Sequence, residues 1–185
     1  MRDVSRAIVG AGEVGSRNAN VESVKYGGEA VAAAADPATW EIWPAPEGHR
    51  EVLYQRFPEF TCLCPRSEYP DFAIVHLVTI PDRKVLELKH LKLWLNSFRD
   101  RAISHELATA EIVDTLARTL ELSYAFILME YTPRGNLLTV PMIEYRHPHL
   151  STLVEEDQLS VALANATRVR DRLIDLAVSM PHRRS

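Results

Sequence analysis

The stretch Phe60-Thr61-Cys62-Leu63-Cys64-Pro65-Arg66-Ser67-Glu68-Tyr69-Pro70-Asp71-Phe72 contains both cysteines of the chain and a carboxylate. Each of its prolines fixes its own φ and disfavours helical backbone at the residue before it, so the stretch is predicted not to be helical. Residues 49–57 before it and 72–80 after it are rich in β-branched and aromatic side chains, which is typical of strands. We therefore expect a loop that joins two strands, the kind of segment on which functional residues often lie.

The segments after this loop predict two helices and then two more strands. Leucines and a phenylalanine recur at helical spacing as Leu88, Leu91, Leu95 and Phe98. Ser104 is a suitable N-cap for a second helix, whose expected buried face is Leu107, Ala110, Val113, Leu116 and Leu120. Residues 122–131 and 137–145 have strand composition and are joined by a turn. The order ββααββ indicates an α+β fold with an antiparallel sheet, because parallel crossovers would alternate strands and helices.

The two ends of the chain are predicted to be extensions of this block. We divide the chain into an N-terminal extension (1–48), a central domain (49–148) and a C-terminal extension (149–185) that carries an amphipathic helix within 153–178. A short helix is expected over 29–35, followed by an irregular segment with prolines and two tryptophans. Gly10, Gly12 and Gly15 match the spacing of a dinucleotide-binding turn, but no strand and helix of adequate length flank them, so a flexible leader is the preferred interpretation.

Composition narrows the function classes. The chain has 185 residues, of which 46% are hydrophobic and 25% charged, as expected of one soluble globular domain. A net charge of −4 provides no basic surface, so neither nucleic acid nor a membrane is the expected partner. We see no signal-peptide pattern at Met1 and no apolar run long enough to span a bilayer, and we expect a cytoplasmic protein. In that compartment a structural disulfide between the two cysteines is not expected, and no second pair exists to complete a structural zinc site. A thiol used in chemistry remains one of the open interpretations.

Cys64 and Asp71 are the candidate reactive pair. A thiolate is a strong nucleophile near neutral pH when its pKa is lowered or a base stands beside it. Asp71 can fold back across the proline-bounded loop as a proton donor if a partly dry site raises its pKa. The alternative, a buried structural cysteine with Asp71 capping a strand, is the commoner arrangement. Cys62 is interpreted as a packing residue.

Further candidates are ambiguous when taken singly. His105 and Glu106 open the second predicted helix, where a carboxylate either caps the helix or accepts a hydrogen bond from a heterocyclic ligand. Glu87 has the same two interpretations. Three cations are either solvated or hold the phosphates of a cofactor, namely Lys89, Lys92 and Arg134.

Together, these motifs resemble one family. The matching segments are Phe60–Pro65, Pro70–Phe72, Glu87–Trp94, Asn96–Arg99, Ser104–Glu106 and Thr132–Asn136. They are similar to the NADPH-dependent 7-cyano-7-deazaguanine reductases, the nitrile reductases of queuosine biosynthesis, over about residues 49–146. The resemblance implies the tunnelling fold, an antiparallel ββααββ unit that assembles into homo-oligomeric rings with active sites between subunits. It also implies NADPH as cofactor and no metal.

The resemblance assigns a role to each candidate. Cys64 matches the nucleophile, which adds to the nitrile carbon to form a covalent thioimide, and Asp71 matches the general acid. The positions that hold the deazapurine are Leu86, Glu87, Leu88, His105 and Glu106. The segment 87–94 resembles the NADPH signature, with Lys89, Lys92 and Arg134 as candidate phosphate ligands.

Some features depart from the family pattern. His90 stands where a small residue is usual, and Pro141 is expected to weaken a central strand or mark an edge. Two other functions remain open at this stage. One is a related amidinotransferase that adds ammonia to a tRNA-borne nitrile, and the other is a non-catalytic module of the same fold.

Overall fold

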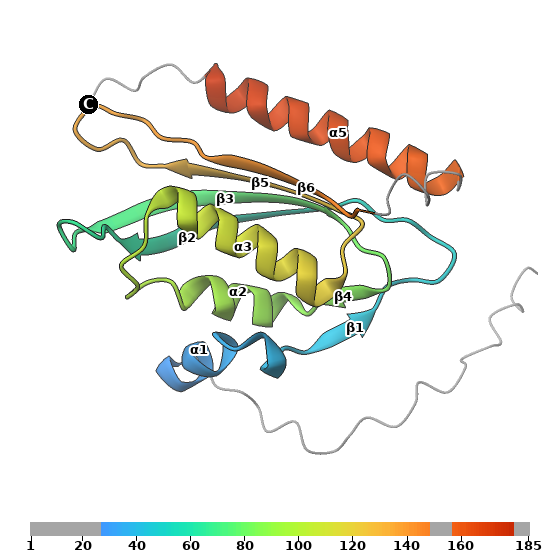
Figure 1. Cartoon of the computed structure of the whole chain (residues 1–185), viewed down its shortest axis with the longest axis horizontal. Helices are drawn as coiled ribbons and strands as arrows, with labels where there is room; N and C mark the ends of the chain where they lie inside the picture. Colours follow the sequence, from blue (N-terminus) through green and yellow to red (C-terminus); the bar gives the residue numbers. More distant parts are fainter. Residues whose placement is uncertain (1–26, 149–156, 180–185) are drawn as a thin grey trace, which may run out of the picture.

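A four-stranded antiparallel sheet in the order β2-β3-β5-β6 forms the centre of the structure, a computed structural model that describes residues 27–148 and 157–179 (Figure 1). Its strands are β2 (Leu53–Leu63), β3 (Pro70–Ile80), β5 (Tyr124–Tyr131) and β6 (Met142–Arg146). A two-stranded sheet pairs β1 (Ile42–Pro44) with β4 (Lys84–Leu86). The helices are α1 (Gly28–Ala34), α2 (Leu88–Asn96), α3 (His105–Leu120) and α5 (Asp157–Val178), with a short 3₁₀ turn at Pro37–Thr39.

The predicted α+β order is confirmed, with β2 and β3 followed by α2 and α3 and then by β5 and β6. This is the antiparallel ββααββ order that the resemblance implies. The strands beside the opening stretch are longer than predicted, because β2 continues to Leu63 and β3 begins at Pro70. Cys62 pairs directly with Asp71 across these strands, so only residues 64–69 form the loop. The glycine spacing of residues 10–15 and the start of the C-terminal extension lie outside the described residues.

Helices α2 and α3 cover one face of the sheet (Figure 1). Phe98, after α2, packs there against Phe60 of β2 with ring centroids 5.5 Å apart, and Trp94 of α2 packs edge-on against Phe98. Leu107 was predicted to be buried and is 63% exposed, and Leu88, predicted to lie on the apolar stripe of the first helix, is 65% exposed. Each lies in the first turn of its helix. The buried stripe of α3 begins at Ala108, the residue after Leu107, and continues through Ile112.

Part of the N-terminal extension belongs to the same packed layer. Trp40 is buried against Trp94 of α2, with centroids 4.9 Å apart, and its indole nitrogen donates to the Ala34 carbonyl. Trp43 lies on β1, which pairs with β4 just before α2 begins. The segment from α1 to β1 is thereby fixed beside the start of α2, while the division of the chain at residue 48 remains a proposal.

The other face of the sheet is covered by α5 (Figure 1). Leu159, Ala162 and Ala166 of this helix are buried against outward-facing residues of β3 and β5, including Val78 and Phe126. The expected amphipathic helix is therefore present over its described part, and its small alanines allow the helix to lie close to the sheet.

Leu159 provides a test of this packing. Replacing Leu159, which is fully buried, with alanine should lower the free energy of unfolding by about 2–5 kcal/mol, because it leaves a cavity between α5 and the sheet. Urea unfolding at fixed protein concentration measures the loss. The control is Val161→Ala on the same helix, where the side chain is 59% exposed and little change is expected. Equal losses in both variants would contradict the packing.

Pro141 lies immediately before β6, which is an edge strand of the sheet. Its carbonyl accepts a hydrogen bond from the Met129 N–H, so the residue contributes an acceptor to β5 without having to supply an N–H to a central ladder. Of the two alternatives for Pro141, the edge position is the one that the structure has.

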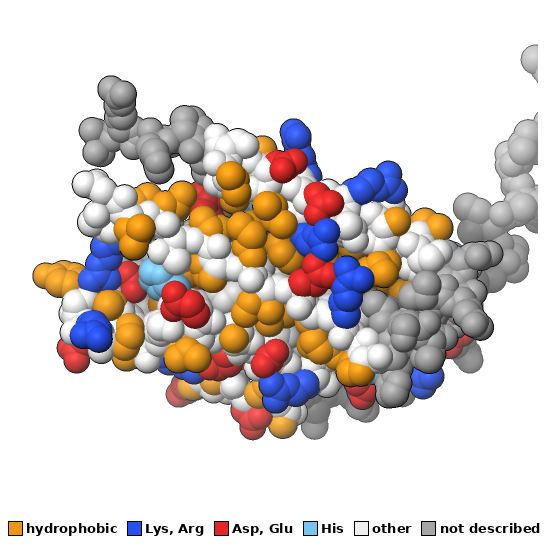
Figure 2. All heavy atoms as spheres, turned by 45° about the horizontal axis from the view of Figure 1, so that its top comes forward, with side chains coloured by type: hydrophobic (Ala, Val, Ile, Leu, Met, Phe, Trp, Pro, Cys, Tyr) orange, Lys and Arg blue, Asp and Glu red, His pale blue; other side chains and the backbone are white. Residues whose placement is uncertain are grey.

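Charges of both signs are mixed across the face shown in Figure 2, and neither sign forms an extended field there. This agrees with the small net charge of −4. Among the described residues, no helix has both the length and the apolar character needed to cross a bilayer.

Candidate active site

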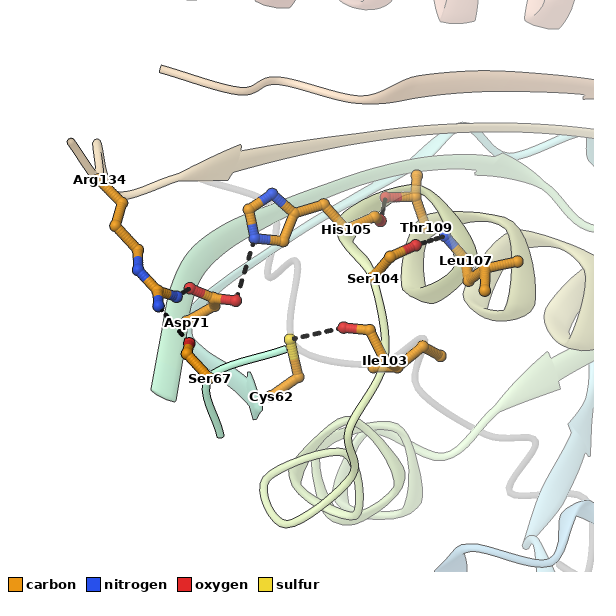
Figure 3. Close-up of polar contacts among 9 residues, drawn as sticks. All are labelled: Cys62, Ser67, Asp71, Ile103, Ser104, His105, Leu107, Thr109 and Arg134. Atoms are coloured by element: carbon orange, nitrogen blue, oxygen red, sulfur yellow. Dashed lines mark hydrogen bonds and ion pairs between the residues drawn. The ribbon is translucent and has the colours of Figure 1, made fainter. Parts of the chain in front are cut away.

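Asp71 is the centre of a polar cluster at one end of the sheet (Figure 3). Its side chain is 7% exposed and contacts two cationic or protonatable groups. Oδ1 accepts from Arg134 Nη1 at 2.7 Å, and Oδ2 lies 3.3 Å from His105 Nε2. Ser67 completes the group, because its Oγ accepts from Arg134 Nη2 at 2.5 Å. We call these four residues the Asp71 cluster.

Four different segments bring this cluster together. Asp71 is the second residue of β3, His105 is the first residue of α3, and Arg134 follows β5 in a turn. Backbone hydrogen bonds fix the 64–69 loop that carries Ser67, from the Cys64 N–H to the Tyr69 carbonyl and from the Glu68 N–H to the Cys64 carbonyl. The loop is also tied to the approach to α3, since Leu63 exchanges hydrogen bonds with Arg101 and Ile103.

Cys64 lies in this loop and is partly exposed. Its pKa is lowered to about 7, first by a hydrogen bond from the Ser67 side chain and then by the backbone N–H groups of Arg66 and Ser67, with a smaller contribution from the charge of Arg134. Ser67 can serve both partners, because its oxygen accepts from Arg134 while its O–H donates to the sulfur. A large thiolate fraction at neutral pH is the property that a nucleophilic cysteine needs.

The lowered pKa of Cys64 can be tested by its alkylation rate. With the thiolate favoured, reaction with iodoacetamide should follow a titration with a midpoint near pH 7, fast above it and slow below it. Mass spectrometry of the peptide that contains Cys64 measures the rate at each pH. Ser67→Ala removes the principal donor and should move the midpoint upward, whereas Ser97→Ala, at the end of α2, should not move it. A midpoint near 9 in the unmodified chain would contradict this environment.

Cys62 has the opposite environment. It is fully buried, and burial together with the charge of Asp71 raises its pKa to about 11. Its sulfur is 3.9 Å from the Ile103 carbonyl (Figure 3). The interpretation of Cys62 as a packing residue is consistent with this burial, and of the two thiols only Cys64 has the exposure and pKa of a nucleophile.

Tyr131 was not identified from the sequence. Its ring stacks on the His105 imidazole, with centroids 3.6 Å apart and planes at 13°, and its hydroxyl interacts with the Cys62 thiol. Tyr131 is 1% exposed, and burial raises its pKa. The stacking holds the plane of the imidazole whose Nε2 faces Asp71. No local signal distinguishes this tyrosine from a core residue at the end of a strand, and the same holds for Ser67 among loop serines.

Glu106 is exposed beside His105 in the first turn of α3. Its pKa is lowered by its own backbone N–H and by the Ser104 hydroxyl. The carboxylate therefore has the hydrogen bonds of a capping residue and is also accessible to a ligand near the Asp71 cluster, so both sequence interpretations fit it.

The junction of β4 and α2, which carries Leu86, Glu87 and Leu88, lies at the opposite end of the sheet (Figure 1). Leu86 packs beside Leu120 at the far end of α3, and α3 is about 24 Å long at 1.5 Å per residue. Glu87 caps α2 there by accepting from the His90 N–H at 3.0 Å. Although burial raises the pKa of Glu87, hydrogen bonds from the Lys89 and His90 N–H groups lower it on balance. One copy of the chain does not bring 86–88 to Cys64.

The surface of α2 suits an anionic cofactor. Lys92 is exposed and, with Arg56 of β2 and Leu88, lines a mostly apolar cavity of about 240 Å³. An apolar cavity can hold a flat ring, and a lysine at its edge can pair with the phosphates attached to that ring. Arg134 lies apart from this cavity, in the Asp71 cluster.

Comparisons with known proteins agree with these features. A family model described as "QueF-like protein" matches residues 70–149. The chain is 50% identical over 106 residues to the NADPH-dependent 7-cyano-7-deazaguanine reductase of Aquifex aeolicus, covering 57% of this chain and 82% of the relative. It is 45% identical over 121 residues to the enzyme of the same name from Sulfurimonas denitrificans, covering 65% of this chain and 97% of the relative. The archaeosine synthase QueF-Like in its apo form aligns with a TM-score of 0.48 at 20% identity, covering 55% of this chain and 98% of that one.

Proposed function

The chain belongs to the family of NADPH-dependent 7-cyano-7-deazaguanine reductases, and we propose on that basis that it reduces the nitrile of 7-cyano-7-deazaguanine to the primary amine. This reaction is a step of queuosine biosynthesis. The observation that supports it most strongly is a partly exposed Cys64, with a pKa of about 7, whose neighbours Ser67 and Arg134 also belong to the cluster around the buried Asp71 carboxylate. The fold and the similarity to these reductases agree with this chemistry.

Cys64 acts as the nucleophile in this proposal. Its thiolate attacks the nitrile carbon, one C–N π bond breaks, and the nitrogen takes up a proton, which gives a thioimide bonded to Sγ. The thiolate is stabilised before attack by hydrogen bonds from the Ser67 hydroxyl and from the Arg66 and Ser67 N–H groups. The same hydrogen bonds stabilise the thiolate that is released when the C–S bond breaks. NADPH would supply the reducing equivalents, one hydride from each of two successive molecules, for the four-electron change from nitrile to amine.

Asp71 supplies the protons. Its Oδ2 and His105 Nε2 are 3.3 Å apart, so one proton can pass between them and on to the substrate nitrogen. Arg134 fixes the other carboxylate oxygen at 2.7 Å, and Tyr131 fixes the imidazole by stacking. The Asp71 side chain is 7% exposed, so its carboxylate is largely shielded from bulk water.

The substrate and cofactor are proposed to be held between copies of the chain. Leu86 lies beside Leu120 at the far end of α3, about 24 Å from the end that carries His105, so we propose that a second copy supplies Cys64 with Leu86, Glu87, Leu88, Lys89 and Lys92. His105, Glu106 and Arg134 come from the first copy. Exposed apolar side chains near the cluster support such a contact, namely Tyr69, Phe72, Leu107 and Leu137. A ring-shaped homo-oligomer in the cytoplasm, without bound nucleic acid, completes the proposal.

Shared sites predict complementation between inactive variants. Cys64→Ala and Glu87→Ala should each inactivate the homo-oligomer, but a mixed assembly contains sites with an intact Cys64 from one copy and an intact Glu87 from its neighbour. Random mixing should restore about a quarter of the original rate. Native mass spectrometry verifies mixing and NADPH absorbance measures the rate. Mixed assemblies without activity would contradict the shared site.

The reaction itself is tested with 7-cyano-7-deazaguanine and NADPH. We expect two NADPH molecules oxidised for each nitrile converted and the primary amine as product. Assembled protein that oxidises no NADPH under these conditions would overturn the proposed function. Incorporation of ammonia in place of hydride would identify the amidinotransferase instead.

A further inference from the structure

A second cluster of chemically active side chains lies where the segment before β1 meets the start of α2. Glu41, Glu87 and His90 each place a ligand atom within 4.8 Å of the other two. Glu87 is the N-cap of α2 and His90 lies three residues later in its first turn, while Glu41 comes from the segment just before β1. We propose that these three residues form a binding site for a divalent transition metal ion such as Zn²⁺.

Existing contacts already fix the three side chains. The Glu87 N–H donates to the Glu41 carbonyl at 3.0 Å, which fixes the two backbones relative to each other. Glu87 Oε2 accepts from the His90 N–H at 3.0 Å and lies 3.1 Å from His90 Nδ1. Trp43 Nε1 donates to Glu41 Oε1 at 2.8 Å. Hydrogen bonds to ligating carboxylates orient them in metal sites, and here they orient them before a metal arrives.

The three proposed metal ligands differ in their exposure to solvent, which gives an ion a route into the site. The His90 and Glu87 side chains are 15% and 18% exposed, whereas Glu41 is exposed. An ion can therefore enter past Glu41 and reach two ligands that are largely withdrawn from water. Three protein ligands leave a further coordination position for water.

The donor set selects the class of metal. One imidazole nitrogen with two carboxylates suits Zn²⁺, Co²⁺ or Ni²⁺, while Mg²⁺ and Ca²⁺ prefer ligands that are all oxygen. Two carboxylate charges balance a divalent ion. Metal and protons compete for the imidazole and carboxylates, so affinity should fall as the pH falls.

Metal binding would have a mechanical effect. Glu41 belongs to the segment that pairs with β4, and Glu87 and His90 begin α2, so the ion joins two segments that are far apart in the sequence. It should therefore raise the melting temperature of the full chain, and a chelator should reverse the rise. The site shares Glu87 with the residues proposed to hold the substrate. Its test needs no turnover, so failure of the metal site and failure of the proposed reduction are distinguishable.

Direct titration tests the site. Isothermal titration of the full, metal-stripped chain with Zn²⁺ should show one ion per chain, and Co²⁺ should give a visible absorption band. His90→Ala and Glu41→Gln should each weaken binding by more than about tenfold. The matched control is Glu47→Gln, in the same segment but outside the cluster, and it should bind as the unmodified chain does. Equal affinity in all four proteins, or no stoichiometric binding, would overturn the proposal.

Trp43 provides a readout that needs no change of a ligand. The indole N–H of Trp43 donates a hydrogen bond to Glu41, so Zn²⁺ binding at Glu41 should change the tryptophan emission of the unmodified chain. Trp43→Phe should remove this change while the titration still shows one bound ion. An emission that does not respond to saturating Zn²⁺ would place any bound ion away from Glu41 and contradict the site, even if the ligand variants failed to fold.

Discussion

Replacing Cys64 by alanine should reduce nitrile turnover by a factor on the order of 10⁴ or more, because the variant lacks the only thiol with the exposure and pKa of a nucleophile. The rate of NADPH oxidation with saturating substrate measures the loss. Binding of the heterocycle should be largely retained, since Cys64 contributes a bond that forms only during the reaction.

Cys62→Ala is the matched control. Its thiol is fully buried and has a raised pKa, so removing it should cost some stability but leave turnover within about tenfold of the original. If Cys62→Ala were inactive in a folded protein and Cys64→Ala active, the assignment of the nucleophile would be wrong.

Asp71→Asn should have the second largest effect, a loss of about 10²–10⁴ in kcat. Asparagine has the same shape and can still accept from Arg134, but it cannot carry a proton between His105 and the substrate. Alkylation of Cys64 should stay possible in the variant, which separates the loss of a proton donor from the loss of the nucleophile. Steady-state kinetics should place the change in kcat more than in KM.

Asp82 offers a matched control for Asp71. It follows the other end of β3 and pairs with Arg50 at 2.7 Å, so Asp82→Asn breaks a comparable carboxylate–arginine contact away from the site. Turnover in Asp82→Asn should be close to that of the unmodified chain. Similar losses in both variants would indicate that Asp71 acts through stability alone.

The fold was largely predictable because its signals are local. Helical spacing at Leu91 and Leu95, the N-cap at Ser104 and strand composition around the proline loop lie within single segments. The strand ends were less predictable, since the continuation of β2 to Leu63 depends on pairing with β3. Burial in the first turns of α2 and α3 also depends on which surface each helix meets, so Leu88 and Leu107 were misplaced.

The site was predictable only in part. Cys64 and Asp71 stood out because two prolines place them in one loop region, and the resemblance added His105 and Glu106. Tyr131 contacts His105 and Cys62 from distant positions in the chain, and such contacts exist only after the sheet has formed. The separation of Leu86–Leu88 from the Asp71 cluster could not be predicted either. The sequence places these residues at the start of α2 but does not show at which end of the sheet that helix starts.

Mass spectrometry of the protein mixed with 7-cyano-7-deazaguanine in the absence of NADPH tests the proposed chemistry most directly. We predict a mass increase equal to the intact nitrile, since addition releases no leaving group, on the peptide that contains Cys64. Addition of NADPH should then remove the adduct and release the amine. An adduct on Cys62, or turnover of the nitrile by the Cys64→Ala variant, would contradict the mechanism.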